Sequence, residues 1–202
     1  MGFIKGGATL CRYRILEEPD EGLTDEFVGQ RLKKNAFSDI EDTPEESSIG
    51  WVEIINYLSA SFYPGSFSFG NFLAFTLRQD ERKLSAKTLN RYYAIREAKF
   101  ITETGRKPNT IKKTEMKESL RLDLLRRSLL STNLYQVVWL KDEAEVWLDG
   151  TSEKIRALFE DYWARTFGLA LRLIVPVSLG IELMPEKFHQ DIIRLMPSSI
   201  WV

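Results

Sequence analysis

The chain has 202 residues, of which 44% are hydrophobic and 28% are charged, close to the values of ordinary globular domains. A chain of this length buries about 70% of the surface that its unfolded form exposes, so it can hold a core without covalent staples. Its single cysteine, Cys11, and single histidine, His189, exclude an internal disulfide framework and most zinc or iron sites.

The N-terminal residues do not have the pattern of a secretory signal. Lys5 is followed by two glycines, and no apolar block stands behind a basic segment. The apolar run over 169–181 is interrupted by Arg172 and Pro176, which leaves it too short for a membrane span. We therefore expect a soluble cytoplasmic protein with no membrane partner.

Charge is unevenly distributed along the chain, although the net charge is only −1. Residues 17–53 contain twelve acidic and three basic side chains, a net charge of −9. Residues 78–127 contain fifteen basic and seven acidic side chains, a net charge of +8. Such segregation favours a polyanionic partner, or self-association through complementary patches.

The first part of the chain predicts one helix among strands. Thr24 is a suitable N-cap, so a helix is expected near 25–35. The acidic stretch 38–48 is expected to be an exposed, mobile loop. Alternating aromatic and β-branched residues predict strands over 3–16, 51–57 and 67–77, with Gly70 marking a bulge in the last.

Two long helices are expected in the basic part of the chain. Ser85 can cap a helix that runs to about Glu103, and the stretch 105–109 breaks it. Thr110 can cap a second helix, which we expect to reach about Leu130. Apolar residues recur at helical spacing in both segments. Each helix is therefore predicted to have an apolar face and a separate basic face.

The last part of the chain predicts a hairpin of strands followed by a helix. We expect strands over 135–140 and 145–148, then a helix over 152–167 that Gly168 stops. A core strand over 169–175 and a weak helix over 185–196 complete the prediction. The class is α+β: a mainly antiparallel sheet packed with helices, plus a protruding pair of long basic helices. We expect one unit over 1–202, with 78–130 as a possible helical-hairpin subdomain.

The patterns that catalysis would require are incomplete. Gly65 and Gly70 have the spacing of a phosphate loop, but the lysine that should follow is missing. His189 has no nearby nucleophile in the sequence. Glu115 and Lys117 have the Glu-x-Lys form found in some metal-dependent nucleases, but Asp20 is too distant in sequence to be the usual partner. We therefore expect no enzyme activity, no cofactor and no metal.

The basic helices are the strongest candidate site. Rows of lysine and arginine on rigid helices can follow successive phosphates, and counterion release then gives affinity without base reading. The alternative is a solvated surface, balanced by Glu97, Glu103, Glu115 and Glu118. Two rows are expected, Lys83, Lys87, Arg91 and Lys99 on the first helix and Lys113, Lys117 and Arg121 on the second, with Arg106, Lys107 and Lys112 filling the break.

The order of residues resembles the bacterial recombination-associated RdgC family from about Gly50 to Met184. No single piece is a sharp motif, and the joint order carries the likeness. The pieces are Gly50-Trp-Val52, Phe72-Leu-Ala-Phe-Thr-Leu-Arg-Gln-Asp-Glu-Arg-Lys-Leu84, Gly105-Arg-Lys-Pro-Asn-Thr-Ile-Lys-Lys-Thr-Glu115, Leu124-Leu-Arg-Arg-Ser128, Val138-Trp-Leu-Lys-Asp142, Val146-Trp-Leu-Asp149 and Ile174-Val-Pro-Val177.

The resemblance implies an α+β protein that binds double-stranded DNA without marked sequence preference. In the family, a dimer closes a ring around the duplex and restrains recombination by the RecA recombinase, which implies a homodimer in the bacterial nucleoid. Older descriptions call the family an exonuclease, which the missing carboxylate cluster does not favour here.

Some features depart from the family pattern. The family's Leu-Leu-Pro-Arg is Leu124-Leu-Arg-Arg127 in this chain. The chain is expected to be a short form without the usual C-terminal third, which leaves ring closure open. A second interpretation remains beside DNA binding: a protein-interaction scaffold that self-associates through its acidic and basic segments.

Overall fold

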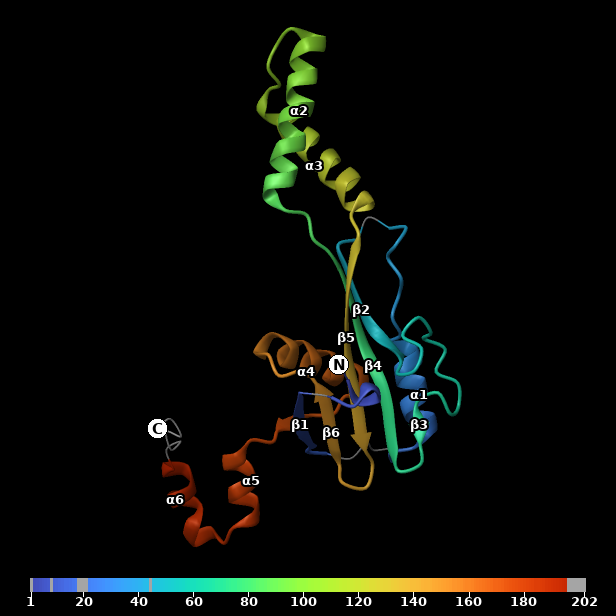
Figure 1. The fold of residues 1–202 in the computed structure, drawn as a ribbon, viewed down its shortest axis with the longest axis vertical. Coiled ribbons are helices and arrows are strands. Elements are labelled where there is room, and N and C mark those ends of the chain that lie inside the picture. Colours follow the sequence, from blue (N-terminus) through green and yellow to red (C-terminus); the bar gives the residue numbers. More distant parts are fainter. Residues whose placement is uncertain (1, 8, 18–21, 44, 196–202) are drawn as a thin grey trace.

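One antiparallel sheet forms the body of the computed structural model, which describes residues 2–7, 9–17, 22–43 and 45–195 (Figure 1). The strands lie in the order β2-β4-β5-β6-β1-β7, and β3 pairs with β4. Each pair of neighbouring strands is antiparallel. The strands are β1 (Leu10–Ile15), β2 (Ser47–Glu53), β3 (Ser68–Phe69), β4 (Phe72–Arg82), β5 (Leu130–Leu140), β6 (Glu145–Asp149) and β7 (Leu171–Leu173).

Two helices, α1 (Asp25–Lys34) and α4 (Glu153–Phe167), supply the helical side chains of the core. Both begin at side-chain caps, because the hydroxyls of Thr24 and Ser152 accept hydrogen bonds from backbone N–H groups of the first turn. Gly168 ends α4 in the left-handed conformation (φ 73°), which a residue without Cβ adopts at little cost. The class is therefore α+β, as the sequence predicts.

The core between the sheet and these helices is mainly aromatic. The ring of Trp163 lies 4.8 Å from that of Trp139 and 4.5 Å from that of Phe167, measured between centroids. The indole N–H of Trp51 donates to the Thr166 hydroxyl at 2.8 Å, so this buried polar group is satisfied. Buried apolar side chains on alternate residues of β4 and β5 thus define one face of the sheet as the core face.

The other face of β4 carries charge, even where it is buried. The Arg78 guanidinium makes two hydrogen bonds to the Asp80 carboxylate and lies 4.1 Å from the centroid of the Phe37 ring. Asp80 is fully buried, where a carboxylate is costly unless it has a hydrogen-bonded partner. Gly50 allows the chain to pass here, since a Cβ would come within 2.2 Å of the Phe37 backbone.

Helices α2 (Ala86–Thr104) and α3 (Thr110–Arg127) connect β4 to β5. The two strands pair along their whole length, from Phe72 opposite Leu140 to Arg82 opposite Leu130. Figure 1 shows that α2 and α3 lie beyond the ends of these strands, at one end of the long axis of the molecule. The helical pair is therefore held at the end of a long two-stranded support.

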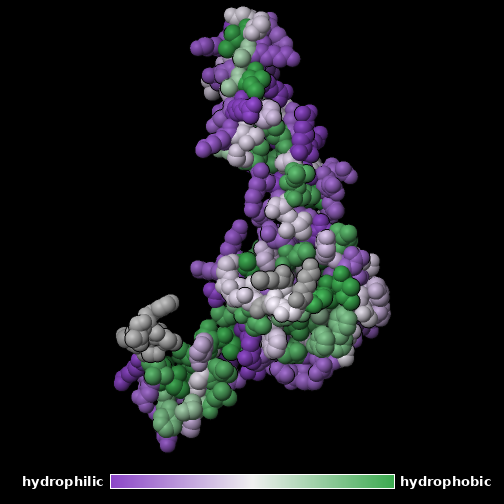
Figure 2. Space-filling model, in the orientation of Figure 1, coloured by the Kyte–Doolittle hydropathy of each residue, from purple (hydrophilic) through white to green (hydrophobic). Residues whose placement is uncertain are grey.

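The C-terminal part of the described chain forms α5 (Pro176–Leu183), a 3-10 turn (Glu186–Phe188) and α6 (His189–Arg194). Glu182 on α5 pairs with Arg14 at 3.1 Å and with Arg172 at 3.8 Å. Apolar side chains around these helices are exposed, among them Leu183 and Leu195, and Figure 2 shows an apolar area over them. Among the described residues, no helix is both long and apolar enough to cross a membrane.

Several local predictions are wrong at element boundaries. Asn109, rather than Thr110, caps α3, and the helix ends at Arg127, so that Leu130 begins a strand. Gly70 lies in the turn between β3 and β4 (φ 69°) and not in a bulge. The expected strand over 169–175 is reduced to β7, because the helix that starts at Pro176 follows directly.

The acidic stretch is not simply an exposed loop. Ser47 and Ser48 belong to β2, and the preceding residues form the acidic loop, residues 39–46, of which the structure describes all but Pro44. Ile40 in this loop is only 1% exposed, and the loop carbonyls of Ile40 and Glu41 accept hydrogen bonds from Arg82. The acidic loop is thus anchored to the base of the helical pair.

Candidate nucleic-acid interface

The candidate site is the basic hairpin, residues 83–127, which consists of α2, α3 and their connections. The hydroxyl of Ser85 accepts from the Thr88 N–H, and the Asn109 side chain accepts from the Lys112 N–H at 2.8 Å. Gly105 (φ 68°) ends α2 in the left-handed conformation. These local caps explain why two separate helices form on either side of residues 105–109.

The helices of the basic hairpin bury only a narrow apolar seam. In α3 only Met116, Leu120 and Leu125 are buried, and α2 has no buried residue among those described. Thirteen lysine and arginine side chains stand against five acidic ones over 83–127, a net charge of +8. Figure 2 shows hydrophilic side chains over much of the hairpin, with small apolar patches between them. The surface is therefore available for charge-based contacts.

One side of the hairpin carries the predicted row of α3. Lys113 lies 3.8 Å from the Glu97 carboxylate of α2, and the Lys117 ammonium lies 5.0 Å from the centroid of the Tyr93 ring. Arg121 pairs with Glu46 of the acidic loop. Partial burial and the nearby Glu97 carboxylate raise the pKa of the Tyr93 hydroxyl, so it is protonated at neutral pH. The row forms, but each member already has a partner.

A second group of basic residues lines a groove between the helices. The groove has a volume of about 420 Å³ and is bordered by Arg96, Lys99 and Lys112. These side chains are partly neutralised, because Lys112 pairs with Glu115 at 2.9 Å and Lys99 with Glu103 at 3.8 Å. All of these pairs are on exposed surface, where ion pairs contribute little and exchange readily.

The hairpin tip contains Arg106 and Lys107, both exposed. They border a second groove of about 430 Å³ together with Lys112. The neighbouring Pro108 is buried, and its ring restricts the backbone by fixing φ. The tip thus places two exposed cations at the far end of the molecule.

The predicted row on the first helix does not form one face. Lys83 precedes α2 and pairs with Glu81 on β4 at 3.5 Å. Lys87 and Arg91 are four residues apart and share a face of α2, but Lys99 is rotated from Arg91 by about 80° because a helix turns about 100° per residue. The basic residues therefore surround the hairpin rather than line one edge of it.

The structure also brings in residues that the sequence did not single out. Arg96 joins the groove and lies 3.7 Å from Asp123 of α3, while Arg126 and Arg127 lie exposed in the last turn of α3. Tyr92 and Ile95 are exposed on α2. The spacing of Arg96 with Asp123 has no local pattern, so only the packing of the two helices could reveal it.

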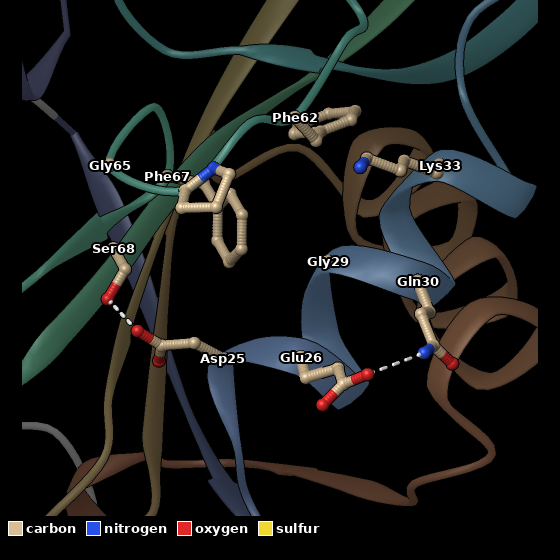
Figure 3. A pocket seen from close by; sticks show the side chains of 10 residues that line it. Asp25, Glu26, Gly29, Gln30, Lys33, Phe62, Gly65, Phe67 and Ser68 are labelled. Atoms are coloured by element: carbon tan, nitrogen blue, oxygen red, sulfur yellow. Dashed lines mark hydrogen bonds between the residues drawn. The ribbon is translucent and has the colours of Figure 1, made fainter.

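The glycine-rich stretch 65–70 borders a different cavity, of about 470 Å³, between α1 and the loop before β3 (Figure 3). The Asp25 carboxylate at its edge accepts hydrogen bonds from Ser68 and Lys141, each at 2.6 Å. These two hydrogen bonds lower the pKa of Asp25. The stretch leads into strand β4 and not into the helix that a phosphate loop requires.

The other catalytic candidates remain apart. Glu115 pairs with Lys112, while Asp20 lies outside the described residues. His189 Nε2 lies 2.9 Å from the carbonyl oxygen of Met184, which belongs to the C-terminal helices. Within the described ranges, no group of three histidine, cysteine, aspartate or glutamate side chains is arranged to hold a metal ion.

Comparison with known families gives a match over most of the chain. A family model described as "Putative exonuclease, RdgC" matches residues 9–166. The chain belongs to the RdgC family. The match includes the basic hairpin and extends to residue 9, further towards the N-terminus than the resemblance in the sequence. The match ends one residue before the end of α4, so α5 and α6 lie outside the matched region. No curated protein matches the chain.

Proposed function

We propose that this RdgC-family protein binds double-stranded DNA without sequence preference, through the basic hairpin. The observation that carries the proposal is a net charge of +8 on residues 83–127, carried by exposed side chains on helices that lie beyond the sheet (Figure 1). Lysine and arginine bind phosphates irrespective of base identity. Family membership supports a role in recombination.

The arrangement of charge suits a backbone-binding surface. Its weak surface ion pairs, such as those of Lys99 and Lys112, can exchange their carboxylate partners for phosphates at small cost. Release of condensed counterions then drives binding, and affinity falls steeply with salt. We propose that the hairpin neutralises about 4–8 phosphates per copy.

The biological setting follows from the same proposal. We propose a homodimer that presents two basic hairpins to one duplex in the bacterial nucleoid and limits access of the RecA recombinase. Two hairpins on one duplex raise the effective concentration of the second contact without any new interaction. We further propose binding without catalysis, so incubation with magnesium or manganese should leave linear and single-stranded DNA intact.

A salt series of DNA binding tests the proposal. Replacing Lys112, Lys113 and Lys117 together by glutamine should weaken binding to all duplexes and reduce the slope of log K against log salt by up to about three. The matched control replaces Lys154, Arg165 and Lys187 by glutamine in the same way. These three residues are exposed and lie outside the hairpin. An unchanged slope in the hairpin variant, or an equal change in the control, would contradict the proposal.

One contact favours the second candidate function, a protein-interaction scaffold. Arg121 of α3 already pairs with Glu46 of the acidic loop, so acidic and basic segments of this chain do bind each other. In a scaffold, the same pairing would join two copies. Light scattering over a salt series separates the two functions: salt-sensitive self-association without DNA binding would support the scaffold.

A further inference from the structure

Arg82 has an unusual environment for a charged residue. It is the last residue of β4 and is only 6% exposed. Its guanidinium donates to the backbone carbonyls of Leu125 at 2.8 Å and Ile40 at 2.7 Å, and also to that of Glu41. A buried cation is costly unless it is hydrogen-bonded, so these contacts account for its place in the structure.

The three carbonyls belong to two segments that are distant in sequence. Leu125 lies in the last turn of α3, where the negative end of the helix dipole favours a cation, and its carbonyl also accepts from the N–H and the hydroxyl of Ser128. Ile40 and Glu41 lie in the acidic loop. The backbone N–H of Arg82 also donates to the carbonyl of Glu46 at 2.8 Å. Arg82 therefore joins the end of β4, the end of α3 and the acidic loop at one point.

The rest of the attachment of the hairpin consists of the exposed ion pair of Arg121 with Glu46, the buried side chain of Leu125 and two short connections. The chain passes from β4 into α2 through residues 83–85 and from α3 into β5 through 128–129, and Figure 1 shows no part of the body beside the far half of the helices. Short connections and one exposed ion pair restrain the angle of the helical pair only weakly. A guanidinium that contacts both the helix end and the acidic loop adds a buried restraint.

We propose that Arg82 is a positioning residue that fixes the angle of the basic hairpin to the sheet, and that DNA binding depends on this fixed angle. The second half of the proposal rests on the proposed function. A duplex is stiff over about 150 base pairs, so it cannot bend to follow a swinging hairpin. A hairpin that is already held in one orientation loses less conformational entropy when it binds.

The chemistry of the contact requires arginine. Its planar group presents five N–H donors in a fixed fork, while lysine has a compact ammonium that reaches fewer acceptors at once. Lysine at this position keeps the charge but holds fewer of the three carbonyls. Arg82→Lys should therefore retain part of the restraint, and Arg82→Met should lose it.

Spin-label distances test the restraint directly, without DNA. Labels on cysteines at Thr102 in α2 and Ala157 in α4, both exposed, in a Cys11→Ser background, report the angle between hairpin and body. We expect a narrow distance distribution in the parent protein, a broad one in Arg82→Met and an intermediate one in Arg82→Lys. An unchanged distribution in both variants overturns the proposal. If Arg82→Met does not fold, Arg82→Lys alone decides.

DNA binding then tests whether the angle matters. Arg82 is buried and cannot reach a phosphate, so Arg82→Lys should lower affinity by about three- to tenfold at every salt concentration, with the salt slope unchanged. Val146→Ala is the control, since it trims a fully buried side chain of β6 and should lower stability without lowering affinity. A flattened slope, or full affinity with a broad distance distribution, overturns the proposal.

The two experiments separate this inference from the proposed function. If the parent protein does not bind DNA, the proposed function fails, while the spin-label result still decides whether Arg82 fixes the hairpin. If the parent protein binds DNA with the expected salt slope and the labels show no change in either variant, only the role of Arg82 fails.

Discussion

The sheet body and the basic hairpin are stabilised by different interactions. In the body, the rings of Trp51, Trp139 and Trp163 are almost fully buried, and large aromatic contacts supply most of the stabilisation. In the hairpin, the buried side chains are those of Pro108 in the tip and of Met116, Leu120 and Leu125 along α3. Charged side chains that are exposed for binding cannot also be buried in a core. The stability of the hairpin therefore depends on its contacts with the body.

The largest expected effect lies in the body. Replacing Trp163 by alanine removes a fully buried ring that contacts Trp139 and Phe167, which should cost about 3–5 kcal/mol of unfolding free energy. Chemical denaturation followed by circular dichroism measures the loss. A cost below about 1 kcal/mol would show that the aromatic cluster does not dominate stability. Tyr92→Ala, on the exposed face of α2, is a control that should change it little.

A smaller and local effect is expected in the hairpin. Leu120→Ala cuts the apolar seam between α2 and α3, and should cost about 2 kcal/mol, at the lower end for buried leucine. Hydrogen exchange should show faster exchange throughout α2 and α3 with unchanged protection of β4 and β5. Equal loss of protection in the sheet would mean that body and hairpin unfold as one unit.

Acid should affect the body through Glu145. Burial opposes ionisation of this carboxyl, but hydrogen bonds from Arg12 and Trp147 and the charge of Arg14 outweigh it and lower its pKa. A depressed folded-state pKa adds stability above the unfolded value, and that stability is lost as pH falls through the folded value.

The unfolding free energy should therefore decline with acid below about pH 4.5, the ordinary value for this carboxyl. The decline should be shallower in Glu145→Gln, because that variant has no carboxyl to protonate. Denaturation midpoints from pH 2 to pH 7, a range spanning the ordinary carboxyl pKa, measure the difference. Parallel curves for the two proteins would exclude this carboxyl as a source of acid sensitivity.

The smallest effect concerns the contact between the two regions. Glu46→Gln removes the exposed partner of Arg121, which should change stability by less than about 1 kcal/mol. DNA affinity should rise slightly, because Arg121 gains freedom to bind phosphate and a repelling charge is lost. Fluorescence anisotropy at low salt is the suitable measurement. Weaker binding would indicate that the acidic loop assists the duplex rather than competing with it.

Sequence reasoning succeeds where the physical cause is local. The caps Thr24 and Ser85 and the stop at Gly168 act within one helical turn, so residue type and spacing are sufficient to find them. The helix at Pro176 could also have been found, since proline is favoured in the first turn, but the apolar run around it favoured a strand.

The remaining contacts have no local signature. The pairing of Arg121 with Glu46 joins residues 75 apart in sequence, and Arg82 reaches Leu125 over 43 residues. In the candidate site, the amount of charge was predictable from composition. Its arrangement on several sides of the hairpin was not, because the start of α2 and the packing angle of the two helices decide it.

The unbroken pairing of β4 with β5 has a mechanical consequence. Because the hairpin leaves the ends of both strands on the same side, a pull along the strand axis shears β4 against β2 and β5 against β6. Backbone hydrogen bonds under shear share the load and rupture together, rather than opening in sequence from one end. We expect single-molecule pulling at Thr102 to rupture the sheet only after the hairpin helices have uncoiled, and rupture in the opposite order would contradict this. If the hairpin binds DNA as proposed, tension on the duplex would be absorbed first by the hairpin.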